Sequence, residues 1–180
     1  MTSLDAPMVD PRDEKYLDLL HIGPDRIEKN TGRLLPALTA REERLISKKF
    51  LFDGAYVLYS KIRPYLRKVA LPEFVGLCSA DMYPVKPIEG KMTREYLWQL
   101  LLSDQFTQYT ETLPARANIP KLNRTEFANF EFLLPPIEVQ MRVSAIFNQL
   151  SNAVVKSSSS ADSMNDLFGI ISQQAFSGKL

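Results

Sequence analysis

The sequence predicts a mixed α/β protein of the α+β type, in which a globular domain over residues 1–134 is followed by a long, coiled-coil-forming helix over residues 135–180. All 12 prolines lie at or before position 136, so the first part is interrupted repeatedly and the last part is not. The second proline of the pair at 135 and 136 suits the first turn of a helix, and Glu138 is placed favourably for the helix dipole. After this junction, apolar residues recur at steps of mostly three or four, which is the pattern of a coiled-coil seam.

The globular part is expected to contain short strands separated by turns. Candidate strands cover residues 16–22, 45–46, 56–62, 74–78, 82–85 and 130–132. Residues 52–54 have the composition of a tight turn, and Pro64 is expected to end the strand that follows it.

Helices are predicted in two places within this domain. One begins after Thr93, a good N-cap residue, and extends to about Tyr109. A second begins at Asn123, which forms a capping-box pattern with Glu126. Residues 113–122 contain two prolines without regular spacing and predict a loop.

The C-terminal helix would be a rod of roughly 60 Å if about forty residues are helical. Its apolar seam would remain exposed in a monomer, which predicts a homodimer. The seam residues expected to make the contact are Val143, Ile146, Leu150, Met164, Phe168 and Ile171. Four serines at 157–160 weaken the helical pattern, and a flexible linker at that point is the alternative interpretation.

Composition narrows the function classes. The single Cys78 excludes an internal disulfide or a cysteine-based zinc site, and the single His21 leaves little for metal or triad chemistry. No metal site and no cofactor are therefore expected. The sequence has no long apolar segment and no secretory signal pattern, which predicts a cytoplasmic protein that does not contact a membrane.

The net charge of +1 does not indicate nucleic-acid binding, but the charge is unevenly distributed. Residues 41–68 contain eight basic and three acidic side chains, a local charge of +5. Such a run is either a phosphate-binding face or simply a solvated one.

Several segments, taken in order, resemble type I restriction-modification specificity subunits, and the first two resemble their target recognition domain. They are YVLYSKIRPY at 56–65, GLCSAD at 76–81, RANIPKLN at 116–123, LPP at 134–136 and AFSGKL at 175–180. The resemblance implies half of such a subunit, with one recognition domain and one long helix. It further implies double-stranded DNA, methyltransferase subunits and a restriction subunit as partners, and binding to one half of a bipartite target.

Candidate DNA contacts follow from side-chain chemistry. Lysine and arginine neutralise phosphates, arginine can also bond to guanine, and asparagine can bond to adenine. We expect the phosphate contacts at the exit of the 56–62 strand, where Tyr65 and Tyr59 add planar groups, and base contacts from the 113–122 loop. The candidates are Lys48, Lys61, Arg63, Tyr65, Arg67, Lys68, Arg116, Asn118, Lys121 and Arg124. Tyr59 and Tyr65 could instead be core aromatics, and the loop residues could be a scaffold.

Catalysis by the chain itself is not expected. The sequence lacks a Gly-x-Gly cofactor loop, a Walker phosphate loop, and an Asn/Asp-Pro-Pro-aromatic element for gripping a flipped base. The competing hypothesis is a non-DNA interaction module that dimerises through its coiled coil. A third is a DNA-modifying enzyme whose catalytic domain lies elsewhere in a longer chain.

Overall fold

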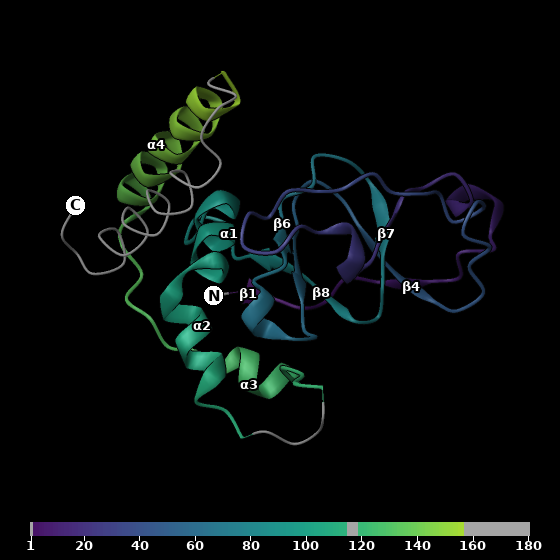
Figure 1. Ribbon diagram of the computed structural model, residues 1–180, viewed down its shortest axis with the longest axis horizontal. Coiled ribbons are helices and arrows are strands. Elements are labelled where there is room, and N and C mark those ends of the chain that lie inside the picture. The colour runs from purple at the N-terminus through teal and green to yellow at the C-terminus, as the bar shows by residue number, and fades with distance from the viewer. Residues whose placement is uncertain (1, 115–118, 157–180) are drawn as a thin grey trace.

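The computed structural model describes residues 2–114 and 119–156, with side chains described at residues 4–114 and 119–149. Two small sheets and a set of helices make up the molecule, with the helices gathered beside the first sheet and the second sheet at the far end (Figure 1). This arrangement confirms the predicted mixed α/β class.

The first sheet has the strand order β1-β8-β5-β6 and is antiparallel throughout. Its strands are β1 (Thr2–Ser3), β8 (Met82–Pro87), β5 (Val57–Ser60) and β6 (Val69–Ala70). The second sheet has the order β2-β4-β7-β3, in which β3 runs parallel to β7. Its strands are β2 (Met8–Val9), β4 (Lys49–Phe52), β7 (Gly76–Cys78) and β3 (His21–Ile22).

Strand β5 lies between two hydrophobic clusters, and its alternation assigns each side chain to one of them. Val57 and Tyr59 pack in the cluster under the helices, whereas Leu58 packs in the cluster of the second sheet. Strand β6 divides in the same way, with Val69 in the first cluster and Ala70 in the second. All four residues of β5 are therefore buried.

Two predicted strands near the N-terminus are corrected. In the 16–22 region only the last two residues form a strand, because Glu14–Tyr16 is a short 3-10 helix, η1. Leu45 lies in a turn in which its amide donates to the Ala40 carbonyl, and Ile46 is 79% exposed. The strand in this region is β4, which begins at Lys49 and was not predicted. The tight turn that follows it is confirmed, since the Tyr56 amide donates to the Asp53 carbonyl.

The long helix predicted from Thr93 is two helices, α1 (Arg94–Leu102) and α2 (Asp104–Glu111). Thr93 caps α1 as expected, because its side chain accepts a hydrogen bond from the Tyr96 amide. Ser103 ends the first helix and caps the second, with its hydroxyl oxygen accepting from the Phe106 amide. A serine in an extended conformation can therefore break a helix that apolar spacing alone would continue.

The helix predicted at Asn123 is confirmed as α3 (Arg124–Ala128), and both hydrogen bonds of its capping box are present. The closing strand predicted at 130–132 is wrong. The Phe130 ring packs on Phe106 and Tyr109 of α2, at centroid distances of 4.9 and 5.1 Å. The backbone of these three residues pairs with no strand in the described part of the chain, so their alternation reflects packing on helices.

Helix α4 (Ile137–Lys156) starts immediately after the two prolines. Val143 and Phe147 are each 3% exposed and belong to the hydrophobic cluster under the helices. Val143 is therefore occupied within its own chain, which corrects its assignment to a dimer contact, whereas Ile146 is 36% exposed. The Leu150 side chain and the residues Met164, Phe168 and Ile171 lie outside what the structure describes.

Across the described ranges, we find no helix with both the length and the apolar character that crossing a membrane requires.

Candidate functional site

The exit of strand β5 is paired with a segment about sixty residues later in the chain. The Arg63 amide donates to the Pro120 carbonyl at 2.9 Å, and the Leu122 amide donates to the Lys61 carbonyl at 2.9 Å. Ile62 and Lys121 form an antiparallel bridge between these two bonds. We call Pro120–Leu122 the paired segment. The pairing brings this end of the predicted 113–122 loop against the strand exit where phosphate contacts were predicted.

The exit of β5 continues into a short 3-10 helix, η3 (Pro64–Leu66). The residues on either side of η3 have backbone angles in the left-handed region. Arg63 precedes it at φ 51° and Arg67 follows it at φ 47°. Proline at the first position of η3 restricts the backbone there, and β5 ends at Ser60, before Pro64, as the sequence predicted. Tyr65 at the centre of the turn is 49% exposed, so it is a surface residue.

We use the term open cluster for Arg63, Tyr65, Lys121 and Arg124. All four side chains are exposed. Within the described ranges, none of the three cations forms an ion pair. Arg124 is the first residue of α3, which follows directly on the paired segment. Three cations and one aromatic residue are therefore exposed at or next to the place where the two segments pair.

The other predicted cations near this strand are engaged by the protein. The Lys61 ammonium donates to the Ala80 carbonyl at 2.7 Å and lies 5.5 Å from the centre of the Tyr83 ring. The Lys68 ammonium donates to the Pro24 carbonyl at 2.7 Å. Arg67 forms an ion pair with Asp104 of α2 at 2.6 Å. These groups join the strand exit to other elements.

Two further members of the basic run are placed elsewhere. Lys48 is exposed beside β4 in the second sheet, so the structure does not bring it to the open cluster. Lys49 is 7% exposed, and its ammonium bonds to the carbonyl and hydroxyl of Ser47. The basic residues between positions 41 and 68 therefore do not form one surface, because the fold places them in different parts of the molecule.

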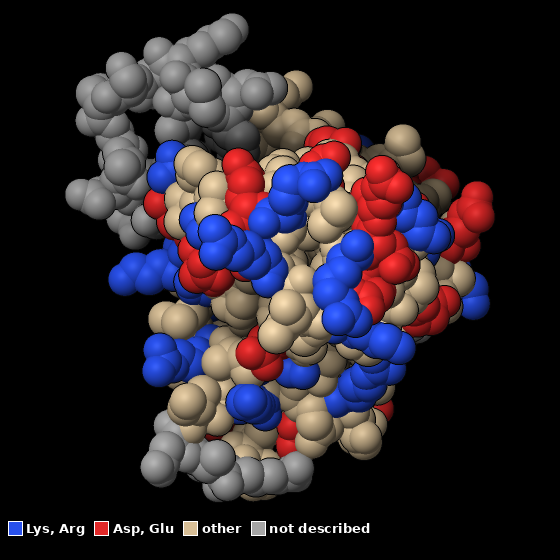
Figure 2. Space-filling view, turned by 90° about the vertical axis from the view of Figure 1, so that its right-hand side faces the viewer, with Lys and Arg blue, Asp and Glu red and all other residues tan. Residues whose placement is uncertain are grey.

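Arginines in the N-terminal part are mostly neutralised by close carboxylates. Hydrogen bonds from Arg12 lower the pKa of Asp10 to about 2. Hydrogen bonds from Arg41 similarly lower the pKa of Asp18. Figure 2 shows the face on the right-hand side of Figure 1. Basic side chains (blue) and acidic side chains (red) alternate over its upper part, and basic side chains predominate lower down.

Tyr59, proposed as a planar group beside the arginines, is instead a core residue at 1% exposure. Its ring makes an edge contact with Phe106 at 5.4 Å, and burial raises the pKa of its hydroxyl. The alternation of β5 explains this, since Val57 and Tyr59 share the face under the helices. Tyr65 is the aromatic residue that reaches the surface.

The hydroxyl of Tyr83 is a positioning group that sequence reasoning missed. It donates to the Leu122 carbonyl at 3.0 Å and so connects strand β8 to the paired segment. The signal available in the sequence was the alternation of β8, which places Tyr83 on the same face as Val85. Which carbonyl it binds depends on the distant segment.

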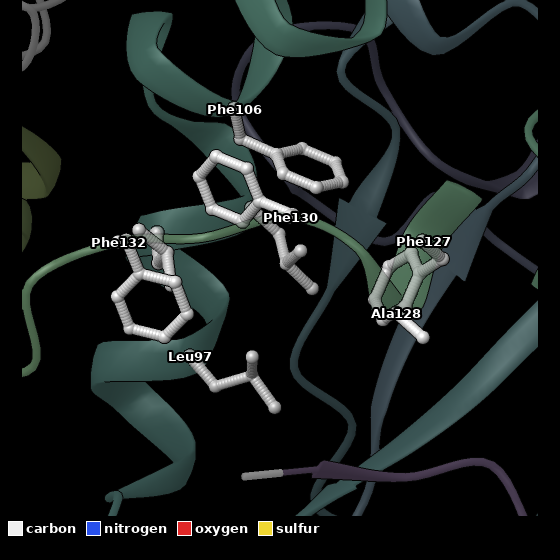
Figure 3. Close-up of a pocket in the computed structure, with 8 residues that line it drawn as sticks. Leu97, Phe106, Phe127, Ala128, Phe130 and Phe132 are labelled. Atoms are coloured by element: carbon white, nitrogen blue, oxygen red, sulfur yellow. The ribbon is translucent and has the colours of Figure 1, made fainter. Parts of the chain in front are cut away.

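An apolar cavity of about 120 Å³ lies between α1, α2, α3 and the chain that follows α3 (Figure 3). The side chains that line it are Leu97, Leu100, Leu101, Phe106, Phe127, Ala128, Phe130 and Phe132. None of these side chains is polar, so the described lining offers no side chain that could orient a polar ligand. Among the described residues there is also no group of three or more histidine, cysteine or acidic side chains arranged for a metal. Arg116 and Asn118 lie outside the described residues.

Residues 37–159 match the model of the family described as type I restriction modification DNA specificity domain. This match covers more than half of the chain. The chain belongs to that family. The family model includes η3, the paired segment, α3 and the described part of α4, so the whole open cluster lies within this specificity domain.

The type I restriction enzyme EcoDI specificity subunit of Escherichia coli is 32% identical over 176 residues. That alignment covers 92% of this chain and 37% of the relative. The HsdS subunit of Thermoanaerobacter tengcongensis has the same fold, with a TM-score of 0.72 and 21% identity over 86% of this chain and 41% of that one. A chain from a structure of type I R-M system assembly and conformational transition gives a TM-score of 0.68 and 19% identity, over 83% and 41% of the two chains. The specificity domain described here thus spans about two fifths of the length of these relatives.

Proposed function

We propose that this chain is the DNA-recognition half of a type I restriction-modification specificity subunit and binds one half of a bipartite double-stranded target. Family membership supports the class of function. The observation that carries the proposal is the open cluster, in which Arg63, Lys121 and Arg124 are exposed and form no ion pair with any described residue. Uncompensated cations on one surface are what binding to a phosphate backbone requires.

In this proposal the cations have different roles. Arg63, Lys121 and Arg124 contact phosphates, and Tyr65 packs against the backbone beside them. Lys61, Arg67 and Lys68 hold the strand exit in place through their internal partners. Lys48 is at most a peripheral contact.

Base reading is assigned to Arg116 and Asn118, which the sequence places between the paired segment and α2. A guanidinium forks onto guanine and a carboxamide onto adenine in the major groove. Their neighbours from Pro120 to Leu122 are bonded to the residues just after β5, which would hold the C-terminal end of this loop near the phosphate contacts.

We assign residues 1–134 to recognition and residues 135–180 to an arm that spaces the two half-sites. A helix of about forty residues, roughly 60 Å long, exceeds the approximately 34 Å of one DNA turn. The chain itself catalyses nothing in this proposal, and methyltransferase and restriction subunits docked on it supply the chemistry.

Self-association through the arm is part of the proposal. Because Val143 is occupied internally, the contact between chains would use Ile146 and the later seam residues Leu150, Met164, Phe168 and Ile171. Replacing Leu150 and Met164 by glutamate is expected to give monomers with a folded recognition domain. Light scattering of the unmodified chain that shows only monomer in the micromolar range would contradict this.

The DNA assignment is tested by reversing the charges of the open cluster in the complex assembled with methyltransferase subunits. We expect Arg63→Glu, Lys121→Glu and Arg124→Glu together to weaken binding to cognate and random DNA alike. The slope of log affinity against log salt should fall by roughly 0.9 for each lost phosphate contact.

The matched control reverses Lys15, Arg44 and Lys86, which are also exposed cations. Equal effects of the two triple variants would show that only net charge matters. An open-cluster variant that binds DNA normally would refute the assignment and favour the non-DNA interaction module.

A further inference from the structure

Helix α4 carries a completely buried polar side chain, that of Gln140, at 0% exposure. Its Oε1 accepts a hydrogen bond from the Thr93 amide at 2.9 Å. Its Nε2 donates to the carbonyls of Lys91 and Pro135, both at 2.9 Å. Both hydrogens of the carboxamide and its oxygen therefore have partners, so neither polar atom of this buried group is left unpaired.

These three hydrogen bonds connect segments with different roles. Pro135 belongs to the linker before α4, whereas Lys91 and Thr93 belong to the turn before α1. Thr93 is also the N-cap of α1, since its hydroxyl oxygen accepts from the Tyr96 amide at 3.1 Å. Figure 1 shows α4 beside α1 at this end of the molecule. One carboxamide thus ties the start of α4 to the start of α1.

Apolar packing alone would hold α4 less specifically. Val143 and Phe147 lie one and two turns further along the same helix face and are buried with the residues of α1. Hydrophobic burial is non-directional, so it tolerates small rotations of one helix over another. Three hydrogen bonds to backbone atoms are directional, and breaking any one would leave a buried polar group unpaired. The polar contact therefore selects one orientation among those that packing permits.

We propose that Gln140 is the positioning residue that sets the direction in which α4 leaves the recognition domain, and through it the distance between the two half-sites. The second part of this inference rests on the proposed function, and the first part does not. An arm acts as a spacer only if its angle to the recognition domain is defined. Any error in that angle grows along the helix, since the displacement of a point on it is proportional to its distance from the pivot.

The test of the first part is a pair of variants at this position and a control on the same helix. Gln140→Glu keeps the shape but turns a donor into an oxygen that faces two carbonyls, and Gln140→Met removes all three bonds without adding charge. Gln149→Glu makes the same chemical change at an exposed position of α4. The fluorescence of Trp98, whose ring N–H donates to the Val69 carbonyl, reports whether the recognition domain has folded.

The helix direction is measured as a distance distribution between spin labels at Val75→Cys and Asn148→Cys, both exposed positions. Cys78 is buried and does not compete for the label. Excess unlabelled chain keeps the measurement within one chain. We expect a narrow distribution in the parent and in Gln149→Glu, and a shifted or broadened one in both Gln140 variants. An unchanged distribution in folded Gln140→Met would overturn the inference.

A measurement on the unmodified chain keeps the inference testable if both variants fail to fold. The Thr93 amide donates to Gln140, so its hydrogen exchange should be as slow as that of core amides in β5 and β8. We call the three hydrogen bonds of the Gln140 carboxamide the clamp. Rapid exchange of the Thr93 amide would show that the clamp is open in solution and would overturn the proposal.

The link to half-site distance is measured on the assembled complex with bipartite DNA sites whose spacers differ in length by single base pairs. The parent and Gln149→Glu should prefer one spacer length, and Gln140→Met should lose that preference. If the helix direction changes but the spacer preference does not, the role in spacing is refuted while the clamp stands. If no variant and no parent complex binds DNA, the proposed function fails and the distance measurement still decides the clamp.

Discussion

The cations around the exit of β5 fall into two groups that the sequence does not separate. Lys61, Arg67 and Lys68 are bound to internal partners. Arg63, Lys121 and Arg124 are exposed and make no ion pair within the part of the chain that the structure describes. Arg63 is only two residues from Lys61 in the sequence. The difference teaches that a local excess of positive charge is not itself a binding surface, because part of it connects the elements that carry the surface.

The backbone around η3 explains the division. Arg63 and Arg67 both occupy the left-handed region, at the two ends of a proline-initiated turn. Asp104 at the start of α2 reaches Arg67, and the paired segment of the chain lies beside Arg63. A cation stays exposed and unpaired when no distant segment brings an acidic or carbonyl group within its reach.

The largest expected effect comes from removing the support of the open cluster without removing charge. Phe127 is the one buried residue of α3, and its ring lies 5.6 to 5.8 Å from those of Tyr59, Tyr83 and Phe106. Phe127→Ala should lower the free energy of unfolding by about 3–5 kcal/mol.

Because α3 carries Arg124, the DNA affinity of the assembled complex should fall as well. Urea denaturation and DNA titration measure the two effects. Thr125→Ala, an exposed change on the same helix, should alter stability by less than about 0.5 kcal/mol. Normal DNA affinity in folded Phe127→Ala would show that α3 does not support the site.

Exchanging one lysine from each group for methionine separates stability from binding. Lys68→Met removes the bond to the Pro24 carbonyl and should cost about 1–2 kcal/mol of stability, with the salt dependence of DNA binding unchanged. Lys121→Met should leave stability within about 0.5 kcal/mol and reduce the salt slope by roughly 0.9. If Lys68→Met changed the salt slope and Lys121→Met changed the stability, the distinction between the two groups would be wrong.

Two substitutions of Arg63 separate its charge from its backbone conformation. Arg63→Gly and Arg63→Ala remove the same guanidinium, so both should weaken DNA binding equally. Glycine adopts φ 51° without a Cβ clash, so the glycine variant should be more stable than the alanine variant by about 1 kcal/mol. Thermal denaturation measures the stability difference. Unequal DNA affinities would mean that the turn conformation, rather than the charge, matters for binding.

The smallest expected effect belongs to the Arg67–Asp104 ion pair. Asp104 is about half exposed, with a side-chain exposure of 49%, so water screens the attraction. A double-mutant cycle with Arg67→Met and Asp104→Asn should give a coupling energy of about 0.5 kcal/mol that decreases with salt. A coupling of zero would leave the position of Arg67 to packing and to its hydrogen bond with the Leu102 carbonyl.

Much of the local structure could be predicted from the sequence because its causes lie within a few residues. The Thr93 cap, the capping box of Asn123 and Glu126 and the turn at Pro64 each depend on local hydrogen bonds or on a ring constraint. The break at Ser103 was missed because apolar spacing continues through it. The alternation at 130–132 was misread because packing on helices can give the same pattern as a strand.

The structure brings together two segments that the sequence singled out, whereas the DNA contacts themselves stay a prediction. The strand exit and the loop were both singled out, and the structure pairs them through Arg63 and Leu122. Tyr59 and Val143 were assigned to contacts outside the chain, and both are buried in its own core. A buried aromatic residue and an exposed one, or a core valine and a seam valine, have the same local sequence properties.

The sequence by itself determined the family, the mixed fold class, the caps and the start of the last helix after two prolines. Only the tertiary structure decided which cations remain open, which carbonyl the Tyr83 hydroxyl binds and where the Gln140 carboxamide finds its three partners. The physical reason is the range of the interactions. Caps and proline constraints act within one turn of chain, whereas burial and hydrogen-bond satisfaction depend on atoms that folding brings together from distant positions.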